Sequence, residues 1–141
     1  MHHLDTRQIK QLQIFRDLLP NEWEQLYPLL SQVRVIEGEQ LLREGERAHR
    51  FFVILKGHFM VHKSDGRAMT LRQKGDIMGW SSVSFPFAYT ASVTALTAGE
   101  VLCISAAEFL ELLQSNPALA EKVLKKISAF INIRQKVGSL Q

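Results

Sequence analysis

The chain has 141 residues, of which 46% are hydrophobic and 22% charged, and its formal net charge is +3. This length and composition predict one globular domain over residues 1–141 and exclude a low-complexity chain. No run of about 18 apolar residues occurs, and the N-terminus lacks the basic-then-apolar order of a signal peptide, so we expect a cytoplasmic protein without a membrane partner.

Two helices are predicted over about residues 5–30. Between Asp5 and Leu19, apolar residues recur at steps of three or four, which is typical of an amphipathic helix. Pro20 interrupts this pattern, and Asn21 is a suitable cap for a second short helix that carries Trp23. The apolar faces of both helices need a partner elsewhere in the chain.

From about residue 32 to 104 the chain changes to short segments rich in Val, Ile, Phe and Thr, separated by glycines. Such segments between turn residues are typical of antiparallel strands in a β-sandwich or roll. The segment Lys63-Ser64-Asp65-Gly66-Arg67 predicts a tight hairpin, because Asp-Gly tolerates positive backbone angles. We therefore predict a double-stranded β-roll, or jelly roll, of about eight antiparallel strands.

Two further helices are predicted over about residues 105–136. The segment Ser105-Ala106-Ala107-Glu108 matches a capping box, and Asn116-Pro117 supplies a cap and a first-turn proline for the last helix. The predicted fold class is mainly β with flanking helices (α+β), with two helices on each side of the roll.

Three glycine-containing motifs of the predicted roll resemble those of the cyclic nucleotide-binding domain family, which includes the sensor halves of catabolite activator and FNR-type regulators. The motifs are Val35-Ile36-Glu37-Gly38-Glu39-Gln40-Leu41-Leu42-Arg43-Glu44-Gly45, Phe51-Phe52-Val53-Ile54-Leu55-Lys56-Gly57 and Gly75-Asp76-Ile77-Met78-Gly79. The resemblance covers roughly residues 10 to 135. It implies the family's β-roll and a regulatory role in ligand sensing.

In that family the ligand pocket follows the Gly-Asp-x-x-Gly turn, where a glutamate holds the ribose hydroxyl and an arginine neutralises the phosphate. By position, Trp80 stands in place of the glutamate and Tyr89 in place of the arginine. A buried phosphate without a charged partner is strongly unfavourable. We therefore expect a stand-alone domain of this family that does not bind a cyclic nucleotide in the ordinary mode. No cofactor is assigned, and a cyclic nucleotide stays an open but doubtful ligand.

The resemblance places the candidate pocket between residues 79 and 92. Its candidate residues are Gly79, Trp80, Ser81, Ser82, Tyr89, Thr90, Ala91 and Ser92. The rings of Trp80, Phe85, Phe87 and Tyr89 either line a cavity for a flat, partly apolar ligand or fill the space that a nucleotide would occupy. The sequence leaves these two alternatives open.

Neither catalysis nor metal binding is predicted. His58 and His62 share one face of a predicted strand, but strand rise separates them by about 13 Å, too far to share one metal ion. With Cys103 as its single cysteine, the chain cannot supply the cysteine ligands of an iron–sulfur cluster. No nucleophile, Walker or paired-carboxylate motif occurs, so we expect no enzyme activity.

The last predicted helix carries the stripe Val123, Ile127 and Phe130. In the family this helix is both the dimer seam and the lid over the ligand, so we expect a homodimer. The alternative is that the stripe packs on its own roll. The chain stops at Gln141 without a helix-turn-helix, which predicts no DNA-binding module and an output that passes to an effector protein in trans.

Two functions follow from these observations. The first is a sensor domain that binds an unknown small ligand at residues 79–92 and signals through its C-terminal helix. The second is a degenerate roll with a filled pocket that acts as a dimerising scaffold for protein interactions.

Overall fold

The computed structural model describes residues 6–83 and 87–136, with side chains placed up to residue 129. Eight strands in this part of the chain form two four-stranded antiparallel sheets, with strand orders β1-β8-β3-β6 and β2-β7-β4-β5. The predicted β-roll of about eight antiparallel strands is confirmed. The strands are β1 (Leu30–Val35), β2 (Gln40–Leu42), β3 (Arg50–Lys56), β4 (Phe59–His62), β5 (Ala68–Leu71), β6 (Ile77–Met78), β7 (Ser92–Ala95) and β8 (Gly99–Ser105).

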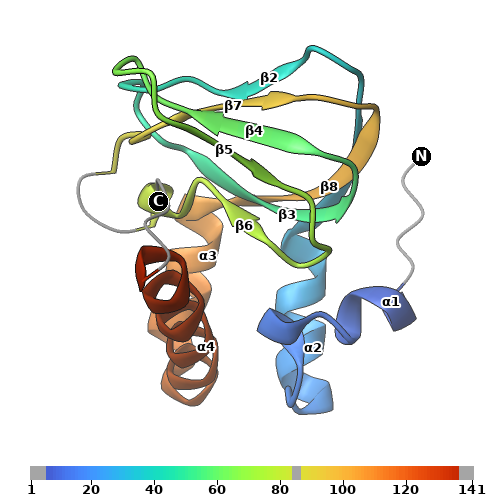
Figure 1. Cartoon of the computed structure of the whole chain (residues 1–141). Helices are drawn as coiled ribbons and strands as arrows, with labels where there is room; N and C mark the ends of the chain where they lie inside the picture. The colour runs from blue at the N-terminus through green and yellow to red at the C-terminus, as the bar shows by residue number, and fades with distance from the viewer. Residues whose placement is uncertain (1–5, 84–86, 137–141) are drawn as a thin grey trace.

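The helices before and after the roll lie together on one side of it, below the β1-β8-β3-β6 sheet in Figure 1. No helix in the described ranges is long and apolar enough to cross a membrane. The helical elements are α1 (Thr6–Lys10), η1 (Gln13–Phe15), α2 (Pro20–Leu26), η2 (Tyr27–Leu29), η3 (Trp80–Ser82), α3 (Ala106–Ser115) and α4 (Pro117–Lys136), the η elements being 3₁₀ turns.

The N-terminal segment differs from its prediction. A continuous helix up to Leu19 is wrong, because α1 ends at Lys10 and Asp17 adopts a left-handed φ of 67°. Leu19, rather than Asn21, caps α2, since Pro20 disfavours helical geometry in the residue before it and itself suits the first helical position. The chain therefore turns sharply just before α2.

The β1-β8-β3-β6 sheet separates two apolar cores, because successive residues of a strand face opposite sides. On β3, Phe51 and Val53 face an outer core shared with the flanking helices. Phe52 and Ile54 face an inner core between the two sheets. The middle of β3 is buried on both faces, which explains its continuous apolar run.

Local signals mark the hairpin and the C-terminal helices as predicted. The Lys63 amide donates to the Arg67 carbonyl at 2.9 Å, and the Asp-Gly turn between them has Gly66 at φ 94°. Ser105 Oγ accepts a hydrogen bond from the Glu108 amide at 3.3 Å, and thus caps α3. The following Asn116 bonds the first turn of α4 in the same way.

Candidate ligand pocket

The predicted pocket begins at Gly79, the residue between β6 and the 3₁₀ turn η3. Gly79 has φ 82°, a left-handed backbone conformation that residues other than glycine rarely adopt. A Cβ atom here would lie 3.1 Å from a Leu42 methyl group and 3.3 Å from both the Arg50 carbonyl oxygen and the Tyr89 ring. Glycine therefore lets three segments of the roll meet at this point.

Tyr89 is the residue that the sequence predicts in place of the family's arginine. Main-chain hydrogen bonds with Gly45 and Glu46 hold it against the loop before β3. Its hydroxyl donates to the Arg50 carbonyl oxygen at 2.7 Å and accepts from the Arg50 amide at 3.3 Å. Burial raises the pKa of the Tyr89 hydroxyl, so the side chain stays neutral at physiological pH. The residue thus supplies a ring to the pocket and no charge.

The space left beside Tyr89 is a cavity of about 10 Å³. This volume has room for roughly one water molecule. None of its described lining residues is charged. They are Leu42, Val61, Met78, Gly79, Ser81, Tyr89, Thr90, Ala91 and Val93.

Three buried hydroxyl groups near Tyr89 in the chain have no hydrogen-bond partner among the described residues, and two of them, those of Ser81 and Thr90, line the cavity. They belong to Ser81, Ser82 and Thr90. Ser81 and Ser82 are only 4% and 3% exposed. Buried hydroxyls without partners are unfavourable, which favours a small polar occupant over a purely apolar one.

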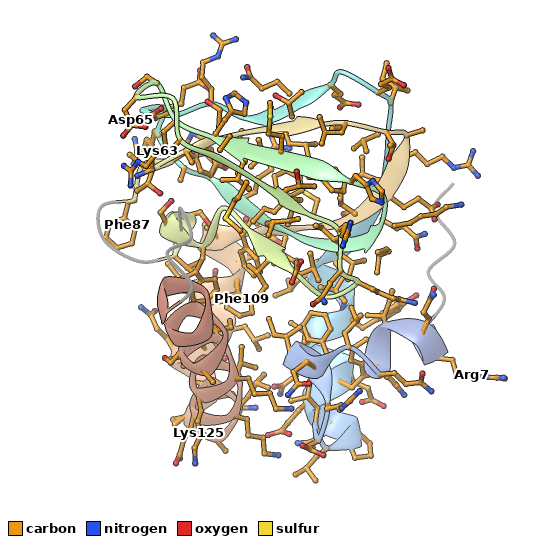
Figure 2. The ribbon with its side chains drawn as sticks, in the orientation of Figure 1. Arg7, Lys63, Asp65, Phe87, Phe109 and Lys125 are labelled. Carbon is orange, nitrogen blue, oxygen red and sulfur yellow. The ribbon has the colours of Figure 1, made fainter. Side chains whose placement is uncertain are left out.

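Trp80, the residue at the family's glutamate position, does not face the cavity. Its ring packs edge-to-face on Phe51 at 5.3 Å and on Phe109 of α3 at 6.2 Å, measured between ring centroids. Phe109 lies below the roll among the flanking helices (Figure 2). Trp80 therefore belongs to the outer core, whereas Tyr89 belongs to the inner core, on the other side of the sheet.

The aromatic-lined pocket considered from the sequence is thus wrong in its composition. Of the four rings, Tyr89 alone lines the cavity within the described chain. Phe87 is 48% exposed, has φ 62° and points outward (Figure 2). Phe85 lies outside the described residues. The rings of Trp80 and Tyr89 lie on opposite sides of the sheet, and main-chain pairing with Gly45 and Glu46 holds Tyr89 on the roll side.

The other predicted pocket residues divide between two surfaces. Ser81, Thr90 and Ala91 line the cavity. Ser92 faces a separate groove, where its hydroxyl accepts a hydrogen bond from the Glu44 amide at 2.9 Å. Sequence reasoning missed the apolar lining residues from β2, β4, β6 and β7, although strand alternation could have indicated Val61.

Two of the three residues of the predicted lid and dimer stripe lie inside the chain's own outer core. Val123 and Ile127 of α4 are 0% and 1% exposed. Neither reaches the inner core that contains the cavity. The side chain of Phe130 lies outside the described residues. Packing on its own roll was the alternative reading of this stripe, and homodimerisation stays a prediction.

The fold and the glycine turn define a small regulatory domain of the ligand-binding β-roll class. The cyclic nucleotide-binding domain profile matches residues 32–116, which is more than half of the chain. The chain therefore belongs to the cyclic nucleotide-binding domain family.

Relatives of known sequence and structure agree with this assignment. A cGMP-dependent protein kinase of Toxoplasma gondii is 35% identical over 91 residues, covering 64% of this chain and 9% of the kinase. The chain thus spans about a tenth of the length of that kinase. A putative cyclic nucleotide-binding protein of Geobacter metallireducens has a TM-score of 0.84 at 20% identity, covering 94% of this chain and 99% of that one.

A second similar structure is the regulatory subunit of a cAMP-independent protein kinase A from Trypanosoma brucei. Its TM-score is 0.71 at 23% identity, with 94% of this chain and 50% of that chain covered. Both structural likenesses, at these identities, concern the fold.

Proposed function

We propose that this chain is a regulatory module of the cyclic nucleotide-binding family whose pocket is closed by its own Tyr89 and which does not take a cyclic nucleotide in the family's ordinary mode. The observation that carries the proposal is the Tyr89 hydroxyl bonded to the Arg50 carbonyl, with its ring against Gly79. The remaining cavity of about 10 Å³ is too small for a nucleotide.

The electrostatics of the pocket support the same proposal. A cyclic phosphate carries a full negative charge, and no described lining residue offers a cation to it. Transfer of an unpaired ion into a low-dielectric interior costs several kcal/mol even after relaxation. The T. brucei regulatory subunit, which belongs to a cAMP-independent kinase, is a precedent for this fold in regulation without cAMP.

The proposed output runs from the pocket to the flanking helices. Trp80 follows Gly79 directly and contacts Phe109 of α3, and α3 packs against α4. A change of conformation at Gly79 would therefore shift the C-terminal helices. We propose that these helices transmit the change to an effector protein in trans.

The test is a thermal-shift and calorimetric titration with cAMP, cGMP and AMP. A ligand at 100 times its Kd stabilises the native state by about 2.7 kcal/mol, so specific binding would be visible. We expect no saturable response from the wild type. Saturable binding of cAMP or cGMP would contradict the proposal.

A Tyr89→Ala variant provides the matched positive arm. Removing the ring should leave an apolar cavity that accepts p-cresol, as engineered cavities accept small aromatic molecules. We expect p-cresol to raise the melting temperature of Tyr89→Ala and to leave the wild type unchanged. If neither protein responds to p-cresol, Tyr89 does not close a cavity.

A second candidate function is the sensing of a small uncharged ligand that displaces Tyr89. The unpartnered hydroxyls of Ser81, Ser82 and Thr90 favour it, because they offer hydrogen bonds to a polar ligand. A panel of small uncharged amides separates the two functions. A saturable shift of the wild type by one of these compounds, absent in Ser81→Ala, would support the sensor over the closed module.

A further inference from the structure

Three polar contacts join α4 to the N-terminal segment of residues 16–25. Near the start of α4, Asn116 Nδ2 donates to Gln25 Oε1 at 2.8 Å. One and a half turns later, Lys122 Nζ lies 2.7 Å from Glu22 Oε1. One turn further, Lys126 Nζ donates to the main-chain carbonyl of Arg16. The contacts run in opposite directions along the two segments, so these segments lie antiparallel.

The middle contact is an ion pair between a buried carboxylate and a partly exposed lysine. The Glu22 side chain is 3% exposed, whereas that of Lys122 is 34% exposed. Glu22 Oε1 also accepts a hydrogen bond from the Leu19 amide at 2.8 Å. A buried carboxylate depends on such partners, because an unpaired charge in this environment is strongly unfavourable.

Asp17 adds two further acceptors for the same lysines. Its left-handed φ of 67° belongs to the few conformations that Asp tolerates better than most residues. Its carbonyl accepts from Lys122 Nζ at 3.3 Å, and its carboxylate oxygen Oδ2 lies 3.6 Å from Lys126 Nζ. The turn at Asp17 thus presents main-chain and side-chain oxygens to two lysines one helical turn apart.

Apolar contacts accompany this polar seam. Val123 and Ile127, the neighbours of the two lysines, are buried in the outer core together with Phe15 and Trp23 of the N-terminal segment. Apolar side chains tolerate small changes of position along a helix, whereas a buried ion pair is satisfied in one arrangement. An apolar pair of similar volume often gives equal or greater stability, so the ion pair serves position more than stability.

We propose that Asp17, Glu22, Lys122 and Lys126 form a latch that holds α4 on the N-terminal segment and that opens without unfolding of the β-roll. With the latch closed, the two ends of the described chain move as one body. With it open, α4 and residues 13–26 become free to adopt a second arrangement. This device does not depend on occupancy of the pocket, so its failure would leave the proposed function untouched.

The experiment is hydrogen–deuterium exchange, read by mass spectrometry, on the full chain at neutral pH. Two neighbouring lysines of α4 form a matched pair: Lys126 belongs to the latch, and Lys125 is an exposed residue outside it (Figure 2). We expect Lys126→Met to raise exchange about tenfold in residues 13–19 and in the adjacent part of α4. We expect Lys125→Met to match the wild type.

Glu22→Gln tests the buried contact, because it removes the charge and keeps the shape. It should raise exchange about tenfold over residues 16–26 and leave strands β3, β4 and β8 unchanged. Glu22→Met/Lys122→Met, which replaces the ion pair by apolar groups, should restore protection. The latch is disproved if Lys126→Met behaves like Lys125→Met, or if Glu22→Gln raises exchange in the strands as much as in the seam.

Discussion

The hydroxyl of Tyr89 donates a 2.7 Å hydrogen bond to the main-chain carbonyl of Arg50, and this bond keeps the Tyr89 ring inside the roll, against Gly79. A neutral ring therefore stands at the position where the family motif predicts an arginine. The consequences of this arrangement and of the Glu22–Lys122 pair can be measured.

Tyr89→Phe keeps the ring and removes the hydroxyl. The Arg50 amide and carbonyl lose a partner in a half-buried site, so we expect the free energy of unfolding to fall by about 1 kcal/mol in urea titrations. Cyclic nucleotide binding should stay absent, since the ring still fills the pocket. Tyr27→Phe, at the other tyrosine of the chain, is the control. An unchanged free energy of unfolding for Tyr89→Phe would show that the hydroxyl does not help to hold the ring in the pocket.

Gly79→Ala and Gly38→Ala separate backbone strain from crowding. Both glycines have positive φ, at 82° and 88°, so each substitution should cost about 1–2 kcal/mol through the left-handed conformation. A Cβ at Gly38 meets nothing within 4 Å, whereas one at Gly79 approaches Leu42, Arg50 and Tyr89. We expect Gly79→Ala to be the more destabilising by about 1–3 kcal/mol, the usual range for overpacking. Equal losses in chemical denaturation would contradict the close approach.

Trp80→Glu restores the family's acidic residue by sequence position, yet we expect it to give no cyclic nucleotide binding. The new carboxylate would enter the aromatic cluster with Phe51 and Phe109 rather than the cavity. Lost packing and charge burial together should lower the free energy of unfolding by about 3 kcal/mol or more. Trp80→Phe, which keeps an aromatic ring, should be much milder. A stable Trp80→Glu protein that binds cAMP would overturn this placement of Trp80.

The Glu22–Lys122 pair predicts a loss of stability in acid. Hydrogen bonds that Lys122 and the Leu19 amide donate to Glu22 lower the pKa of the Glu22 carboxyl below the value near 4.3 expected for an unfolded chain. The folded state then binds fewer protons than the unfolded state. The stabilisation is therefore complete above about pH 4.5 and is lost as the pH falls through the lowered folded-state pKa.

Urea titrations of the wild type and Glu22→Gln across this pH range measure that loss. Asp17, which pairs with Lys126, is another charged residue close to this pair. The quantity of interest is therefore the difference in the free energy of unfolding between the wild type and Glu22→Gln. It should be largest near neutral pH and shrink in acid. Asp65, whose pKa Arg67 also lowers, is an exposed control, and Asp65→Asn should change the pH profile little. A difference independent of pH would argue against the charged pair.

Much of the fold follows from local patterns. The strand texture of residues 32–104, the Asp-Gly turn at Gly66 and the caps at Ser105 and Asn116 each depend on neighbouring residues, and each was predictable from the sequence. The N-terminal segment was harder to predict. The apolar periodicity of residues 5–19 is compatible with one continuous helix, but it is equally compatible with the observed short helix, 3₁₀ turn and reversal at Asp17.

The sequence predicts where the candidate site lies and which charged residues it lacks, but it does not predict how the residues there are arranged. Glycine motifs identify the turn at Gly79, and the absence of a glutamate and an arginine is plain in the printed sequence. In the sequence, Trp80 and Tyr89 cannot be told apart in role, because each is an aromatic residue at a position where a charged residue is expected. Which side of the sheet each ring enters depends on pairing between residues distant in the chain, such as Tyr89 with Gly45 and Glu46.

The sequence by itself thus determined the β-roll with flanking helices and the loss of the charged anchors, since both are properties of residue type and short spacing. Only the tertiary structure decided that Tyr89 lies in the inner core, that Trp80 packs on the helices, and that Glu22 pairs with Lys122 across 100 positions of chain. The physical reason is that burial and pairing of these side chains depend on the packing of distant segments, which local periodicity does not specify.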